Sequence, residues 1–304
     1  MGAIQKQTYF FNSRLQLIID HCKFMNEVKT LLAANDLDGA IQAAINHVKS
    51  KPTDMTARTF LFELLIFAGE FERAEKQLDV LGQQDVNAMI GTQIYRQCIA
   101  AERVRQKVFT ADAVPQFITA KPAYVGLALD AIRDLRNGNA AAAREKLDQC
   151  ENDRPANAGK LNGTGDFQDF RDYNDLTASV LEVFLKGEYV WLPLENIKKI
   201  KIDKSQSLRD MCWTQATIES IDGTNGEVHL PALYVNSFKS SDNEIRLGKA
   251  TDWADAGEDI FIGAGTRLFW MDGAAQPLAE IETLEFNHAA TDEPMLQSEE
   301  ELTM

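Results

Sequence analysis

Residues 33–44 read AANDLDGAIQAA, and the same arrangement returns 34 residues later as FAGEFERAEKQL at residues 67–78. A third copy, RNGNAAAAREKL, occupies residues 136–147. Each copy places an alanine at the same offset from its turn-forming residues, at Ala40, Ala74 and Ala143. A 34-residue repeat with alanine at a fixed position is typical of tetratricopeptide-like helical hairpins, which usually serve as binding surfaces for other proteins.

Apolar residues around these copies recur at helical spacing, so each copy is expected to lie inside a hairpin of two helices. The three hairpins are predicted at residues 25–49, 59–81 and 124–150. Two prolines support this alignment, because Pro52 follows Ala40 by the same 12 residues that separate Pro155 from Ala143.

Two further features of the helical half can be predicted. The run TFLFELLIF at residues 59–67 is apolar almost all round, which predicts a helix enclosed by its neighbours. A separate helix is expected at residues 87–108, between the second and third hairpins, because its apolar residues keep helical spacing at Ile90, Ile94, Ala101, Val104 and Val108.

Beyond Pro155 the pattern changes from helical to strand-like. Residues 156–166 are rich in Asn, Gly, Asp and Pro and predict a linker. A helix is expected from Phe167 to Lys186, ended by Gly187. Short alternating or apolar runs then predict β-strands at residues 188–192, 197–202, 213–221, 226–235, 259–271 and 280–286.

The sequence therefore predicts an α+β protein. Degenerate tetratricopeptide-like repeats occupy residues 25–155, and a helix with a smaller β-rich domain, a barrel or a strongly bent sheet, occupies residues 167–290. Residues 1–24 are either a genuine extension or the product of an upstream start, since Met25 stands where the repeat pattern begins. Residues 291–304 are expected to form an acidic disordered tail.

Composition limits the partners. The formal net charge of −15 argues against a nucleic-acid partner, because phosphate binding needs a basic surface. No apolar run approaches the roughly 20 residues that cross a bilayer, and LQLII at residues 15–19 is too short for the core of a signal peptide. The widely spaced Cys22, Cys98, Cys150 and Cys212 fit free thiols in a reducing compartment. We expect a cytoplasmic protein with no membrane partner.

No motif in the sequence carries a recognisable chemistry. The four histidines, His21, His47, His229 and His288, lack the spacing of a metal site. The glycine strings at residues 162–166 and 262–267 lack the lysine and the following helix of a phosphate-binding loop. We expect no metal, no cofactor and no catalytic residue, and hence a protein that is not an enzyme.

Residues 246–260, RLGKATDWADAGEDI, combine unusual residue types for a predicted loop. In one interpretation Trp253 fills the core of the small domain, while Asp252 caps a turn and pairs with Arg246 or Arg267. In the other, the segment is a loop that binds a partner or a ligand, because loops on a rigid scaffold often carry function. That loop site would consist of Arg246, Asp252, Trp253 and Arg267.

Four strings follow the repeat segment FLFELLIFAGEFERA (60–74) in a specific order: LRDMCW (208–213), LPALYVNS (230–237), RLGKATDW (246–253) and TRLF (266–269). Together they resemble the ImpE/TagJ family, accessory proteins of bacterial type VI secretion clusters. The resemblance covers residues 25–287 and leaves out the N-terminal extension and the acidic tail.

The resemblance implies a non-catalytic adaptor. Family members are associated with the contractile sheath and are thought to bind a helix of its small subunit, and some relate to the AAA+ ring ATPase that dismantles contracted sheaths. In stacked hairpins, an amphipathic partner helix lies in a concave groove. Counted from the repeated alanines, that groove would present Lys29, Leu32, Thr59, Glu63 and Ile66. Lys29 and Glu63 are expected to be exposed, whereas Leu32 and Ile66 are alternatively core residues.

A second class of function stays open at this point. The β-rich domain could bind a small molecule or act as an enzyme delivered by a repeat module, with the 246–267 loop as its site. Thermal stabilisation by a metabolite or a metal would favour this class. Recovery of sheath subunits or of the ring ATPase by co-purification would favour the adaptor.

Overall fold

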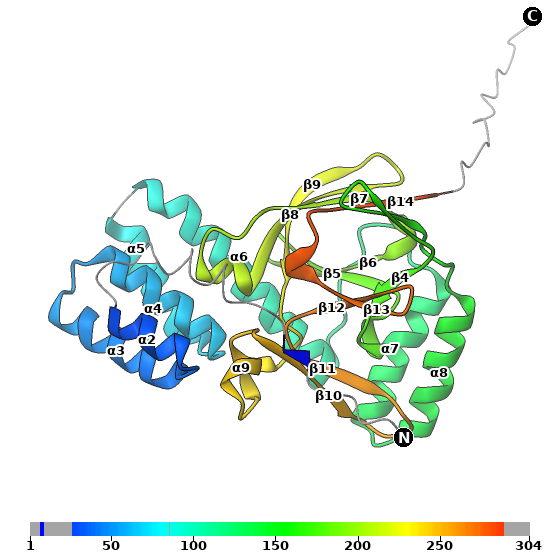
Figure 1. The fold of residues 1–304 in the computed structure, drawn as a ribbon, viewed down its shortest axis with the longest axis horizontal. Helices are drawn as coiled ribbons and strands as arrows, with labels where there is room; N and C mark the ends of the chain where they lie inside the picture. The colour runs from blue at the N-terminus through cyan, green and yellow to red at the C-terminus, as the bar shows by residue number, and fades with distance from the viewer. Residues whose placement is uncertain (1–6, 9–25, 85, 289–304) are drawn as a thin grey trace, which may run out of the picture.

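The computed structural model describes residues 7–8, 26–84 and 86–288 of the 304-residue chain. Its long helices are α2 (Asn26–Ala33), α3 (Leu37–Ser50), α4 (Met55–Phe67), α5 (Phe71–Gln84), α6 (Val86–Thr110), α7 (Ala123–Arg136) and α8 (Ala140–Asp153). Figure 1 shows α2–α5 at one end of the molecule and the strands with α7 and α8 at the other. Apart from residues 7–8, the predicted extension at 1–24 lies outside the described residues, as does the predicted tail at 291–304.

The three predicted hairpins are confirmed, and their turns share one hydrogen-bond pattern. Each first helix ends at a residue in the left-handed region, with φ of 62°, 70° and 79° at Asn35, Gly69 and Gly138. In the second hairpin, Gly69 N donates to the carbonyl of Ile66 (3.1 Å) and Glu70 N donates to that of Leu65 (2.9 Å). The other two turns have the equivalent bonds. This is the Schellman arrangement, so the turn residues of the sequence repeat are the C-terminal caps of α2, α4 and α7.

The repeated alanines lie where paired helices touch. Ala40, Ala74 and Ala143 are each 0% exposed, because the helices of each hairpin approach closely at these positions. The helix predicted to be enclosed is α4, in which every residue from Phe60 to Phe67 is buried. The repeat therefore specifies both the turns and the closest helix contacts.

The named strands of the described residues pair with one another in antiparallel fashion. The large sheet runs in the order β3-β2-β14-β7-β8-β9-β5-β6, with β3 and β6 as its two edges, so it is not a closed barrel. Its members are β2 (Gly159–Leu161), β3 (Gly165–Phe167), β5 (Val180–Leu185), β6 (Glu188–Pro193), β7 (Ile197–Ile202), β8 (Trp213–Ser220), β9 (Asn225–Pro231) and β14 (Thr283–Phe286). One three-stranded sheet contains β1 (Gln7–Thr8), β10 (Ala250–Asp255) and β11 (Phe261–Gly265). A second contains β4 (Phe170–Asp172), β12 (Leu268–Met271) and β13 (Ala274–Pro277).

Two predictions for residues 156–186 are wrong. The expected linker forms β2 and most of β3, joined by a turn in which Asn162 and Gly163 both have positive φ. The helix expected from Phe167 to Lys186 is replaced by the end of β3, by β4, by a short 3-10 turn and by β5. Asn-Gly pairs favour tight hairpin turns. An apolar run such as VLEVFL does not by itself distinguish a buried strand from a helix.

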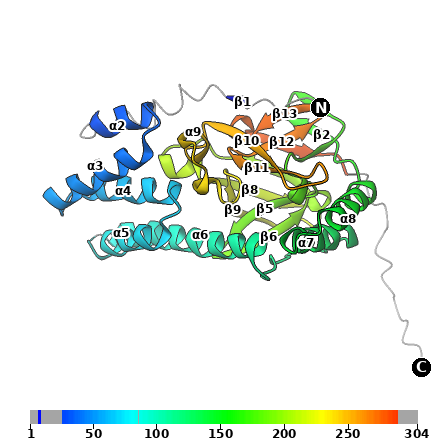
Figure 2. The same cartoon turned by 90° about the horizontal axis from the view of Figure 1, so that it is seen from below.

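Helix α6 connects the two halves of the fold and confirms the helix predicted at 87–108. It runs for 25 residues and packs on β5 and β6, on one side of the sheet in Figure 2. One hydrophobic cluster continues from the hairpins through α6 to strand residues such as Phe184, Trp191 and Trp213, and a second lies within the β-rich part. The division into two domains stays a prediction, and the two halves share this core.

Candidate functional site

The groove predicted to hold a partner helix is filled by the protein itself. The 3-10 turn η3 (Leu208–Met211) packs against α4. Arg209 from this turn pairs with Glu63, and its Nε donates to the Tyr95 hydroxyl (2.6 Å). Nearby, Phe238 covers Gly69 so closely that a Cβ on Gly69 would lie 2.4 Å from the ring. The LRDMCW string and Phe238 together therefore close the groove with the chain's own side chains.

The structure buries or half-buries all five residues predicted to line that groove. Leu32, Glu63 and Ile66 are 1%, 5% and 5% exposed, whereas Lys29 and Thr59 are half-buried. The prediction that Lys29 and Glu63 are exposed is wrong. Glu63 lies within an apolar helix, where the ion pair with Arg209 offsets part of the cost of its burial. For Leu32 and Ile66 the alternative interpretation as core residues is confirmed.

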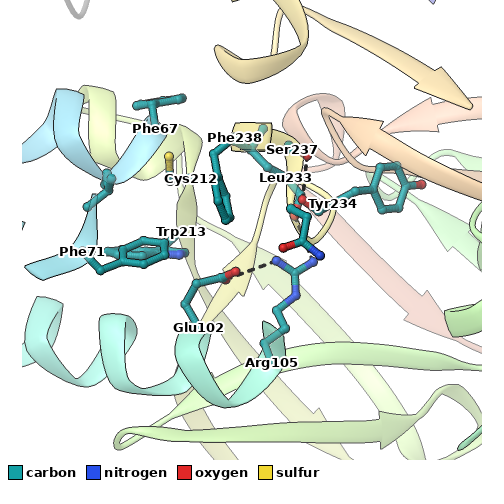
Figure 3. Close-up of a pocket in the computed structure, with 12 residues that line it drawn as sticks. Phe67, Phe71, Glu102, Arg105, Cys212, Trp213, Leu233, Tyr234, Ser237 and Phe238 are labelled. Atoms are coloured by element: carbon teal, nitrogen blue, oxygen red, sulfur yellow. Dashed lines mark hydrogen bonds and ion pairs between the residues drawn. The ribbon is translucent and has the colours of Figure 1, made fainter. Parts of the chain in front are cut away.

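A small cavity of about 30 Å³ remains where α4, α5 and α6 meet the β-rich half (Figure 3). Aromatic rings of Phe71 and Trp213 stand on one side of it, and Glu102 and Arg105 lie on another, paired at 3.2 Å. A cavity of this size has room for a water molecule or two and not for a ligand. It is a gap in the packing at the joint between the two halves.

Beside this cavity, a buried ion-pair network joins α6 to the sheets. Arg105 of α6 donates from Nε to Glu182 on β5 (2.7 Å), and Glu102 pairs with the same arginine. Arg267 pairs with both Glu182 and Asp172 of β4. Their side chains are between 0% and 8% exposed. The network therefore links helix α6 to strands β4 and β5.

The network fixes the protonation of its carboxyl groups. Burial disfavours the charged form of Glu182, but Arg105 and Arg267 outweigh it and lower its pKa to about 2. Burial raises the pKa of Glu102 and of Asp172, which their arginines offset only in part. Structural ion-pair networks perturb pKa values as catalytic sites do. These groups are buried and bonded to one another, at the joint between α6 and the sheets.

The four residues proposed as a loop site do not converge. Arg246 ends α9 (Asn243–Arg246) and pairs with Asp38 of α3 at 3.1 Å. Lys249 donates to the carbonyl of Leu32 (2.6 Å) at the end of α2. The RLGKATDW string thus holds the first hairpin against the β-rich half, which is a structural role.

Asp252 and Trp253 lie on strand β10 and not in a loop. Trp253 is half-buried and packs against Tyr173 and Tyr234, with ring centroids 5.2 and 5.5 Å apart. Exposed Asp252 accepts a bond from the Trp253 amide at 2.9 Å. Its predicted pairing with Arg246 or Arg267 is wrong, because Arg267 is engaged in the buried network and Arg246 with α3.

Metal and membrane sites can be assessed only for the described part of the chain. There, no three side chains of His, Cys, Asp or Glu gather as a metal ion would require. No helix within the described ranges has the length and apolarity to cross a membrane. Cys98, Cys150 and Cys212 are buried free thiols, and burial raises the pKa of each, which keeps them protonated and unreactive.

Among the network residues, only Arg267 is also a predicted site residue, and the site predicted for it is a different one. The sequence contains a signal for two of the other network residues. Glu182 interrupts the apolar run VLEVFL, and Arg105 falls on the apolar stripe of α6. A charge inside a buried element requires a partner. The sequence could therefore have indicated that both are paired, but not with which residues.

The pair between Glu63 and Arg209 predicts a pH dependence of stability. Burial raises the pKa of Glu63 to about 7, from 4.5 in the unfolded chain. Between pH 4.5 and about pH 7 the folded state keeps the Glu63 proton that the unfolded state has released. The contribution of this proton to the free energy of unfolding is therefore full below pH 4.5 and is lost as the pH rises through about 7. Relative to Glu63→Gln, the wild-type free energy of unfolding should fall by about 2 kcal/mol between about pH 5 and about pH 8. Urea unfolding of both proteins at each pH tests this, and a pH-independent difference would contradict it.

A family model described as ImpE protein matches residues 164–285. The type VI secretion system accessory component TagJ of Pseudomonas aeruginosa is 32% identical over 256 residues, which cover 84% of this chain and 89% of that protein. The chain belongs to the ImpE/TagJ family. A crystal structure of protein VPA1032 from Vibrio parahaemolyticus has the same fold, with a TM-score of 0.80 at 23% identity, and covers 87% of this chain and 99% of that one.

In this ImpE/TagJ family member, the segment that the family model matches contains most of the joint between the two halves. Asp172, Glu182 and Arg267 of the buried network lie within it, as does Arg209 of the groove-filling turn. Arg105 and Glu63, their partners on the helices, lie before it. The matched segment is therefore the β-rich half together with the residues that anchor the helical half to it.

Proposed function

We propose that this chain is a non-catalytic adaptor of a bacterial type VI secretion system and acts in the cytoplasm. The observation that carries the proposal is the 32% identity to a TagJ protein, named an accessory component of that system, along 89% of its length. As its partner we propose a helix of the small subunit of the contractile sheath. Through this contact it would influence how the AAA+ ring ATPase disassembles the sheath.

The described side chains favour binding over catalysis. The strongly perturbed carboxyl groups are engaged in buried ion pairs, and the cavity beside them is too small for a substrate. Stacked helical hairpins are a common scaffold for protein recognition. Both observations are consistent with a protein whose task is to hold another protein.

Co-purification tests the proposed function. When the chain is co-expressed with the small sheath subunit of its own secretion gene cluster, we expect a stoichiometric complex that survives size-exclusion chromatography. A sheath subunit without the partner helix serves as the control and should elute separately. The ring ATPase is tested in the same way. Failure to bind the sheath subunit and the ATPase, together with thermal stabilisation by a metabolite, would support a small-molecule function of the β-rich half instead.

A further inference from the structure

The apolar stripe of α6 is longer than the surface that covers it. Along one face of the helix, side chains recur at spacings of three and four residues, at Ile90, Ile94, Cys98, Ala101, Arg105 and Val108. Residues three and four apart lie above one another on a helix. The stripe is therefore a single continuous surface.

The two ends of this stripe differ sharply in exposure. Ala101 and Val108 are 0% and 2% exposed, because this part of α6 packs on β5 and β6. Ile90 and Ile94 are 70% and 37% exposed, and the adjacent Met89 is 55% exposed. Monomeric proteins leave single apolar residues in water, but a contiguous apolar strip marks an interaction site.

The stripe is uncovered because the sheet ends beside it. Strand β5 stops at Leu185 and turns at Lys186-Gly187, whereas β9 continues beside β8. In the described part of the chain, β9 pairs with β5 only where His229 meets Phe184. A hollow of about 200 Å³ results, lined by Ile94, Tyr95, Gln97, Phe184, Lys186 and His229, among others. Cavities of this size accommodate an aromatic ring.

From these features we infer that the exposed end of the α6 stripe, with the hollow beside it, is the docking surface for an amphipathic helix of the partner. This surface is defined by Met89, Ile90, Ile94 and the hollow. The inference rests on the proposed function and states where its contact is made. The partner helix would cover the N-terminal part of this face of α6, as β5 and β6 cover its C-terminal part.

The chemistry of the surface specifies the occupant. Ile90 and Ile94, one turn apart, form a ridge that fits between side chains spaced three or four residues apart on a second helix. One large apolar side chain of that helix enters the hollow. The exposed side chains of Lys186 and Glu227 at the hollow form no hydrogen bond or ion pair with the described residues. A helix with an acidic and a basic residue beside its apolar face would neutralise both.

The groove on α4 cannot take this role in the folded protein. Arg209 and Phe238 occupy it, and Glu63 at its centre is 5% exposed. A partner helix would have to displace η3 and break a buried ion pair before binding. Removing one partner from such a pair is costly. The α6 surface requires no such rearrangement.

Isothermal titration of the full chain with the intact small sheath subunit tests the inference. The variant Ile90→Asp/Ile94→Asp should weaken binding at least about 30-fold, as loss of a central apolar contact does. Ile118→Asp is the matched control, because Ile118 is 52% exposed but follows the other end of α6, and it should bind within about twofold of wild type. Hydrogen exchange of the wild-type complex should show protection of amides 89–97, a readout that does not depend on how the variant folds.

The outcomes distinguish a wrong docking surface from a wrong proposed function. If wild type binds, the double variant binds equally well and amides 89–97 gain no protection, the docking surface lies elsewhere and the adaptor role stands. If wild type itself does not bind the sheath subunit, the proposed function fails and this inference fails with it. Selective loss of binding in the double variant, with protection of α6, establishes the surface.

Discussion

Replacing Arg267 with methionine is expected to lower the free energy of unfolding by about 3–5 kcal/mol. Arg267 is 1% exposed, and its guanidinium holds Asp172 and Glu182 on two different strands. Its Nε also donates to the carbonyl of Pro231 (2.9 Å). Methionine preserves much of the side-chain volume but leaves Asp172 buried without its arginine. The effect therefore reports the lost charge and not a lost hydrophobic contact.

Urea unfolding followed by circular dichroism measures this change. Lys198→Met is the matched control, because Lys198 also pairs with a glutamate, Glu219, at 2.6 Å, but its side chain is 59% exposed. Exposed ion pairs contribute little to stability, so the control should hardly move the unfolding midpoint. Similar midpoint shifts in the two variants would show that burial of the Arg267 pairs has no energetic consequence.

The helical half could be predicted well because its determinants are local. At Asn35, Gly69 and Gly138 each helix ends through two bonds, so the signal lies within a short window. The residue itself donates to the carbonyl three positions earlier, and the residue after it donates to the carbonyl five positions before its own. Strand β7 follows IKKIKI without error, since its alternation exposes lysines on one face and buries isoleucines on the other. Local pattern and local structure agree at these positions.

The joint between the halves could not be predicted, because its partners are distant in sequence. Arg105 lies 77 residues from Glu182, and Arg209 lies 146 residues from Glu63. Periodicity within a single helix reveals which face is apolar but not what covers it. For that reason the repeat register predicts Glu63 on a surface, although the apolar residues on every side of it on α4 indicate a buried position. The same limit applies to α6, whose stripe predicted a helix without revealing that only part of it is covered.

The filled groove changes how the repeat should be interpreted. In this chain the second hairpin uses its inner face to hold η3 and Phe238, and so binds the β-rich half of the same molecule. The repeat is thus first a scaffold for the chain's own fold. Among the surfaces that the β-rich half leaves open, the N-terminal part of α6 carries Met89, Ile90 and Ile94, three of the six large apolar side chains that are exposed in the described residues.

A fragment that ends at Pro155 is expected to lose cooperative unfolding altogether, although it retains α2–α8 in full. The deletion removes η3 and Phe238 from α4, and β5 and β6 from α6. Ile66 on α4 and Ala101 and Val108 on α6 belong to a cluster that includes strand residues, so their cover would be gone. Exposed apolar surface of this extent leads to aggregation or to a molten state. Thermal melting and binding of a hydrophobic dye measure the outcome.

Co-expression of residues 156–304 with this fragment is the control. If the loss is caused by the missing cover and not by damage to the hairpins, the two pieces should associate and restore a cooperative transition, because the buried pairs of Arg105 and Glu63 can form again across the break. A fragment that melts cooperatively on its own, without binding the dye, would show instead that the helical half is an independent domain. Its groove on α4 would then be open to a partner, and this groove and the α6 surface would both be candidate docking sites.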